Sequence, residues 1–117
     1  MNLMETYAMM GADGKAAAGR VGSEDTLGLL ARMFLEDGTY AELEAAVEAE
    51  DADAAFEAAH TLKGLSLNLG LDPLTGPACA LTDALRAGQR DLPAVPALWQ
   101  EVKQAYARVA AALARLD

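Results

Sequence analysis

Apolar residues near the C-terminal end of the chain recur at alternating spacings of four and three. The positions are Val95, Trp99, Val102, Tyr106, Val109, Leu113 and Leu116. This spacing aligns the side chains along one side of an α-helix, as in a helix that packs lengthwise in a bundle. The pattern therefore predicts a long C-terminal helix with a continuous apolar side.

Two helices are indicated between residues 22 and 50. Ser23 is expected to cap the first, which ends at Asp37–Gly38. Thr39 and Glu42 have the spacing of a capping box, which opens a short second helix. The residues expected to face inward are Leu27, Leu30, Ala31, Phe34, Leu43, Ala46 and Val47.

Two further helices follow. One is expected over Asp53–Leu69, closed by Gly70. The next has Asp72 as its N-cap and Pro73 at its first position, and it stops at Gly88. The inward positions of the pair are Ala55, Ala58, Leu62, Leu65, Leu69, Ala78, Leu81 and Leu85.

Residues 1–21 contain apolar positions at helical spacing, but three glycines interrupt them. We expect one or two short helices here, packed on the rest of the chain. No strand pattern, internal repeat or linker is present. The sequence therefore predicts an all-α fold: an antiparallel up-and-down four-helix bundle with one or two short extra N-terminal helices, in a single domain over residues 1–117.

Composition and charge narrow the function. The net charge of −9, from 18 acidic and 9 basic residues, disfavours nucleic acid and anionic membranes as partners. No apolar run approaches the roughly 18 residues of a membrane span. Cys79 is the single cysteine, so no intrachain disulfide can form, and a reduced cytoplasmic setting is expected. We also expect the chain to be a monomer.

His60 is the only histidine. At about 100° per residue, its side chain projects about 160° away from the inward Leu62, and it is therefore expected to face solvent. The residues predicted to share its outward face are Phe56, Glu57, Lys63, Gly64, Leu67, Asn68 and Leu71. Apolar residues on an exposed face indicate a contact surface, which we assign to Phe56, Leu67 and Leu71.

The residues one turn after His60 suit a nucleophile. Neutral imidazole is a competent nucleophile, and the ammonium of Lys63 can reach the space above the ring to stabilise added negative charge. Gly64 lies mid-helix at a cost of about 1 kcal/mol relative to alanine, and it clears space for another molecule. Asn68 could add a hydrogen bond.

The segment from Ala58 to Gly70 resembles the signature of histidine phosphotransfer (HPt) domains, which is roughly His-x-x-Lys-Gly followed by Asn and Gly. The resemblance implies that His60 carries a phosphoryl group on its outer ring nitrogen, that Lys63 neutralises this group, and that Gly64 leaves room for the partner. Leu65 and Leu67 depart from the smaller residues expected in the family, which affects the shape of the docking surface.

The resemblance further implies a phosphorelay intermediate of two-component signalling. His60 would accept the phosphoryl group from a receiver-domain aspartate and pass it to another, with response-regulator receivers and a hybrid histidine kinase as partners. The chain would need no cofactor of its own, because Mg²⁺ would be held by the receiver. No phosphate-binding GxxxxGK[ST] loop is present, so autonomous kinase activity is not expected.

Two alternatives remain open. The chain could be the phosphoryl-accepting module of a chemotaxis-type histidine kinase, or a non-catalytic helical adaptor that binds receivers. A metal site is disfavoured, because one histidine and one cysteine on different helices do not make a ligand set. Cys79 is interpreted as a packing residue.

Overall fold

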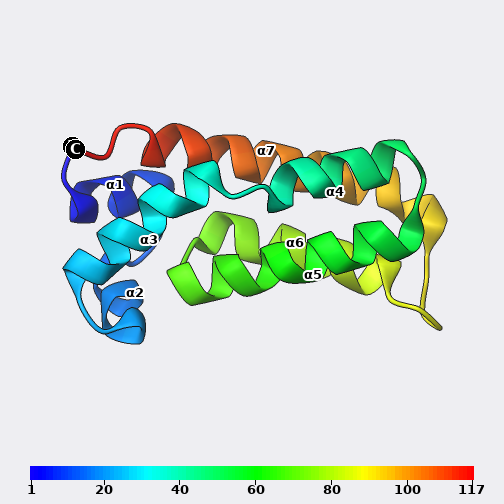
Figure 1. Ribbon diagram of the computed structural model, residues 1–117, viewed down its shortest axis with the longest axis horizontal. Helices are drawn as coiled ribbons and strands as arrows, with labels where there is room; N and C mark the ends of the chain where they lie inside the picture. The colour runs from blue at the N-terminus through cyan, green and yellow to red at the C-terminus, as the bar shows by residue number, and fades with distance from the viewer.

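The computed structural model describes residues 1–117, and every regular element in it is helical (Figure 1). The elements are α1 (Leu3–Met10), α2 (Gly14–Val21), α3 (Glu24–Glu36), α4 (Thr39–Glu48), α5 (Ala52–Leu69), α6 (Asp72–Leu85), the 3₁₀ helix η1 (Leu92–Ala94) and α7 (Val95–Leu113). This confirms the all-α prediction and the two short N-terminal helices. No helix combines the length and the apolar character that a membrane crossing requires.

Helices α4 to α7 form an antiparallel up-and-down bundle (Figure 1). Helix α5 packs between α4 and α6, and α6 packs on α7. Helix α4 reaches α7 through aromatic side chains, since the Tyr40 ring stacks on Tyr106 at a centroid distance of 3.8 Å and on Trp99 at 5.5 Å. These large rings separate the two backbones and close the fourth side of the bundle.

Most of the inward positions that the periodicity predicts are buried in the core, whereas Leu30, Val47 and Tyr106 are only partly buried. Each helix of the bundle contributes a fully buried side chain, among them Leu43, Leu62, Leu81 and Val102. In α5 the buried side also includes Ala59 and Ser66, whereas Leu65 is only partly buried and packs at the edge of the core. Ser66 is accommodated because its hydroxyl donates to the Lys63 carbonyl at 2.8 Å and accepts from Thr75 at 3.3 Å.

The capping box predicted for Thr39 and Glu42 is wrong. Thr39 is the first helical residue of α4, and Gly38 is its N-cap, with no side-chain capping bond. The carboxylate of Asp37 instead accepts a hydrogen bond from the Thr39 backbone N–H at 2.8 Å. The Asp37 carboxylate therefore pairs a backbone N–H group at the start of α4 that has no partner within the helix. Thr39 is then the first residue of the helix and not its cap.

The start of α6 also differs from prediction. Leu71 is the N-cap and Asp72 the first helical residue, with Pro73 next, and the helix ends at Leu85, before Gly88. The cause lies in how α5 ends. Gly70 has φ +64°, and the N–H groups of Gly70 and Leu71 donate to the Leu67 and Ser66 carbonyls, as in a Schellman motif. This motif buries Leu71 and leads straight into α6.

The N-terminal helices cover the end of the bundle at the α5–α6 turn (Figure 1). The Tyr7 hydroxyl donates to the Leu69 carbonyl at 2.6 Å, and Arg20 donates to the Leu67 carbonyl. Burial, with a smaller contribution from the carboxylate of Asp72, raises the pKa of Tyr7 from 10.0 to about 12. Two carbonyls at the last turn of α5 are thereby satisfied from the N-terminal segment.

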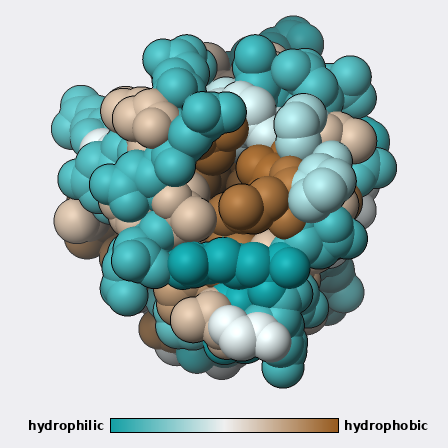
Figure 2. All heavy atoms as spheres, turned by 90° about the vertical axis from the view of Figure 1, so that its right-hand side faces the viewer, coloured by the Kyte–Doolittle hydropathy of each residue, from teal (hydrophilic) through white to brown (hydrophobic).

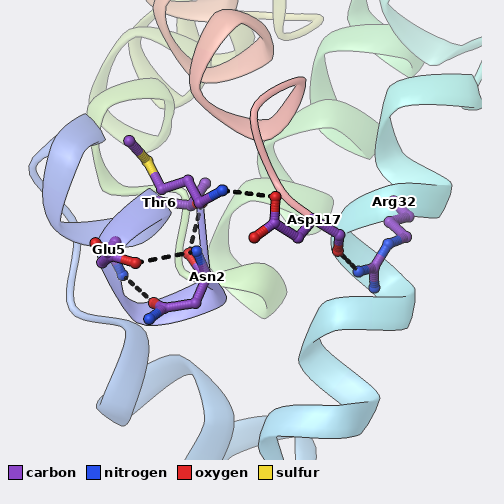
Figure 3. A network of polar contacts seen from close by, with 6 residues as sticks. Asn2, Glu5, Thr6, Arg32 and Asp117 are labelled. Atoms are coloured by element: carbon purple, nitrogen blue, oxygen red, sulfur yellow. Dashed lines mark hydrogen bonds and ion pairs between the residues drawn. The ribbon is translucent and has the colours of Figure 1, made fainter.

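The two ends of the chain meet at the same end of the molecule (Figure 3). The Met1 ammonium contacts the Asp117 carboxylate at 2.7 Å, and Arg32 donates to the Asp117 carbonyl. Asn2 and Glu5 form a capping box at the start of α1. Such an exposed ion pair contributes about 1 kcal/mol or less, so the buried Tyr7 contact matters more for holding this region.

Candidate functional site

The side chain of His60 projects from the middle of α5 into solvent. His60 is exposed, while its neighbours Ala59 and Leu62 on the other side of the helix are 0% and 1% exposed. The imidazole takes part in no hydrogen bond and no ion pair in the structure. The side chain is therefore exposed and no other group of the chain binds its ring nitrogens, as the sequence predicts for a nucleophile.

The sequence fixes α5 at both ends. The carboxylate of Asp51 caps its start by accepting from the Ala54 N–H at 3.1 Å, and Gly70 ends it in the left-handed conformation. Between these caps the buried face is packed against α4 and α6. His60 thus stands on a rigid helix and not on a loop, which holds the direction of its side chain.

An aromatic ring lies beside the imidazole. Phe56, one turn before His60, has its ring centroid 5.8 Å from that of the imidazole, with 33° between the planes. Phe56 is half-buried. It supports one side of the imidazole and presents apolar surface next to it.

A second cation approaches this face from α6. The guanidinium of Arg86 lies over the Phe56 ring, with Cζ 5.3 Å from the centroid, and forms an ion pair with Asp83 at 3.4 Å. The pattern along α5 does not indicate Arg86, because this residue lies elsewhere in the chain, as the C-cap of α6. Its position follows from hairpin register, since α5 and α6 run antiparallel about the turn at Gly70 and residues equally far from that turn pair.

Lys63 and Gly64 follow His60 by one turn. Lys63 is half-buried and takes part in none of the ion pairs of the structure, so its ammonium is free to meet an anion. Gly64 is exposed, and a Cβ added there would meet no atom within 4 Å. The face beyond His60 is therefore open, with Lys63 one turn after the imidazole and Arg86 over Phe56, the residue one turn before it.

The other predicted surface residues are divided by the structure. Glu57 and Asn68 are exposed, and Leu67 is 48% exposed, which is high for leucine. The prediction for Leu71 is wrong, because its side chain is 0% exposed and packs in the core beneath the α5–α6 turn. Leu71 lies beyond the end of α5, so extending the helical face past Gly70 misplaced it.

The structure contains no cluster of three or more His, Cys, Asp or Glu side chains arranged for a metal ion. Cys79 lies half-buried on α6.

Comparison with known protein families identifies the family of the chain that carries this face. A family model, the Hpt domain, matches residues 30–112. The chain belongs to the Hpt domain family. The match includes α4, α5, α6 and all but the last residue of α7, and so contains the whole face around His60. Hpt domains carry out histidine phosphotransfer in two-component signalling. No curated protein and no solved structure matches the chain.

Proposed function

We propose that this Hpt domain is a phosphorelay intermediate in which His60 accepts a phosphoryl group from a receiver aspartate and passes it to a second receiver. One observation carries the proposal. The only imidazole of the chain is exposed and free of hydrogen bonds on a rigid helix, with open space above Gly64 and a free ammonium at Lys63.

The transfer requires an in-line approach of the phosphoaspartate to the outer ring nitrogen, Nε2. The Nε2 lone pair attacks phosphorus, and the bond from phosphorus to the aspartyl oxygen breaks with its electron pair returning to the carboxylate. Nδ1 keeps its hydrogen, so no proton has to move during the transfer. The same steps in reverse deliver the group to the next receiver.

Charge on the phosphoryl group is then stabilised from two directions. Lys63 acts as a point charge one turn after the ring. Arg86 holds a second charge over Phe56 and exchanges its partner Asp83 for the phosphoryl oxygens. The chain supplies no metal ion in this scheme, since Mg²⁺ bound by the receiver neutralises the group on its side.

Docking of a receiver uses the surface around the imidazole. Phe56 and Leu67 provide apolar area, Glu57 and Asn68 provide polar contacts, and Gly64 lets the partner's backbone approach closely. Leu71 takes no part, because it is buried. We propose response-regulator receivers and the receiver of a hybrid histidine kinase as partners of a monomeric, cytoplasmic chain.

The test is a transfer assay with a phosphorylated receiver. Wild-type chain should gain an acid-labile, base-stable label, whereas His60→Gln should gain none and keep its fold by circular dichroism, because the residue faces water. Mapping the label on the wild-type chain provides a second measurement. Label retained by His60→Gln, or mapped to any other residue, contradicts the proposal.

The same assay distinguishes the alternatives. A non-catalytic adaptor would bind the receiver without taking label. The accepting module of a chemotaxis-type kinase would be labelled by a kinase catalytic domain with ATP and would not take label back from a phosphorylated receiver. The proposed intermediate exchanges label with receivers in both directions.

A further inference from the structure

The two ends of the bundle differ in whether other helices cover them. Helices α1 to α3 cover the end at the α5–α6 turn, whereas the end formed by the α4–α5 turn and the α6–α7 connection is open (Figure 1). A hollow of about 510 Å³ lies at this open end. In the view onto this end, apolar atoms fill the hollow and mostly hydrophilic surface surrounds it (Figure 2).

The floor of the hollow is apolar and already ordered. It includes Ala55 and Leu85, each 2% exposed, and Trp99, whose ring is held by stacking on Tyr40 at 5.5 Å. Beside them, Leu92 on η1 is 55% exposed. An apolar side chain that entered the hollow would cover Leu92 and find a rigid surface beneath it, without prior rearrangement of the bundle.

The rim carries charge of one sign. Glu50 and Asp51 line the hollow, and no lysine or arginine does. Glu50 has φ +55°, a left-handed conformation that is unusual for a residue with a side chain, at the turn from α4 to α5. The nearby Arg90 is engaged elsewhere, because it donates to the Asp53 carboxylate and to the Leu85 carbonyl.

We propose that this hollow is a second docking site, which binds a short segment of a protein partner that presents an apolar side chain next to a lysine or arginine. The apolar floor accepts the first group, and the carboxylates of Glu50 and Asp51 attract the second. The charge complementarity selects a basic segment over an acidic one.

The site is separate from the face that carries His60. Ala55 in the floor and His60 lie about 140° apart around α5. A partner in the hollow therefore leaves the imidazole open to a receiver. The proposal does not depend on phosphotransfer, and it adds a site by which the domain could be held near another protein while His60 reacts.

The test uses Trp99, the only tryptophan of the chain, as a fluorescent reporter in the floor of the hollow. The probe is a short amphipathic peptide of leucine and lysine, and its counterpart has glutamate in place of lysine. The lysine peptide should shift the Trp99 emission with saturation, and added salt should weaken it. The glutamate peptide should have no effect at the same concentrations.

Two matched variants locate the binding. Leu92→Asp should weaken binding of the lysine peptide about tenfold or more, whereas Leu29→Asp should not, although Leu29 on α3 is 58% exposed, much as Leu92 is. Glu50→Gln should weaken binding of the lysine peptide and leave phosphoryl transfer at His60 unchanged.

Three results would overturn the proposal: no saturable shift of the Trp99 emission, equal binding of both peptides, or full binding of the lysine peptide by Leu92→Asp. Self-association that Leu92→Asp abolishes would do so too, because the occupant would then be a second copy.

Discussion

The two sides of α5 differ in what their side chains do. On the inward side, Ala59, Leu62 and Ser66 are at most 1% exposed and pack against the neighbouring helices. On the outward side, His60 and Gly64 are exposed, and only Phe56 at the edge contacts both the imidazole and the core. One helix therefore carries the stability of the bundle on one side and its chemistry on the other.

This division means that stability and phosphotransfer can be changed independently. A residue that packs inward contributes through the apolar area it buries, and its loss leaves a cavity. A residue that faces outward contributes little to the free energy of unfolding, and its substitution should mainly change partner binding and phosphoryl transfer. Substitutions on the two sides should accordingly affect different measurements.

The largest expected effect on stability is that of Leu62→Ala. Leu62 is 1% exposed in the core, so its truncation should lower the free energy of unfolding by about 2–5 kcal/mol. Urea denaturation measures this loss. Leu67→Ala on the same helix is the control, since Leu67 is 48% exposed and its truncation should change stability by about 0.5 kcal/mol or less. Equal losses of stability in Leu62→Ala and Leu67→Ala would contradict the distinction between the inward and outward sides of α5.

Tyr7→Phe tests the connection between the N-terminal segment and α5. It leaves the Leu69 carbonyl without its 2.6 Å donor, which should lower stability by about 1–3 kcal/mol. The pKa of Tyr7 is raised to about 12, so its contribution is complete below pH 10 and is lost as the pH rises toward 12. Denaturation at a series of pH values should show this loss in the wild type. Burial also raises the pKa of Tyr40 and Tyr106, so Tyr7→Phe should keep part of this alkaline loss. A loss as large as in the wild type would contradict the contribution of Tyr7.

Lys63→Gln addresses the chemistry of the outward side. Removing the free ammonium should slow phosphoryl transfer about tenfold, equivalent to about 1.4 kcal/mol of transition-state stabilisation, with unfolding unchanged. The rate is measured by quenching the transfer reaction at a series of times and counting the label on the chain. Lys15→Gln on α2 makes the same change of charge away from the site and should transfer normally. A rate unaffected in Lys63→Gln would leave Arg86 as the phosphate-facing cation.

Among these substitutions, the one at Gly64 is expected to raise stability and not to lower it. Gly64→Leu places a side chain in open space, so helix propensity should raise stability by about 0.5–1 kcal/mol while the side chain obstructs docking and slows transfer. Gly19→Leu on α2, which also meets nothing within 4 Å, controls for the gain in helix propensity. Unimpeded transfer in Gly64→Leu would show that the receiver does not approach over this glycine.

The bundle and the direction of His60 were predictable because both follow from helical periodicity within one segment. The predictions failed where the chain leaves a helix. Leu71 was placed on the surface by extending α5 past Gly70, and its burial results from the Schellman turn. Capping by Asp37 in place of Thr39 depended on a local backbone conformation that several sequences can adopt.

Features made by two or more helices were beyond a segment-by-segment interpretation. Arg86 reaches the site only through the packing of α6 on α5 and its contact with Phe56. Ser66, polar by type, is buried with its hydroxyl bonded to the Lys63 carbonyl in its own helix and to Thr75 on the next helix. The hollow at the open end is lined by residues of α4, α5, α6, η1 and α7 and of the α4–α5 turn. Periodicity alone contains no information on these pairings.

The most direct measurement of the role of His60 uses no partner protein. Phosphoramidate, a small-molecule phosphoryl donor, should transfer its phosphoryl group to Nε2 of the exposed imidazole with release of ammonia. After the excess reagent is removed by desalting, the protein should retain one ³¹P resonance typical of a phosphorus–nitrogen bond, which disappears in acid. The ¹⁵N resonance of Nε2 in the single histidine should shift with it, and His60→Gln should show neither signal. A phosphorus resonance that persists in the variant, or an imidazole that stays unmodified in the wild type, would contradict the assignment of His60 as the phosphoryl acceptor.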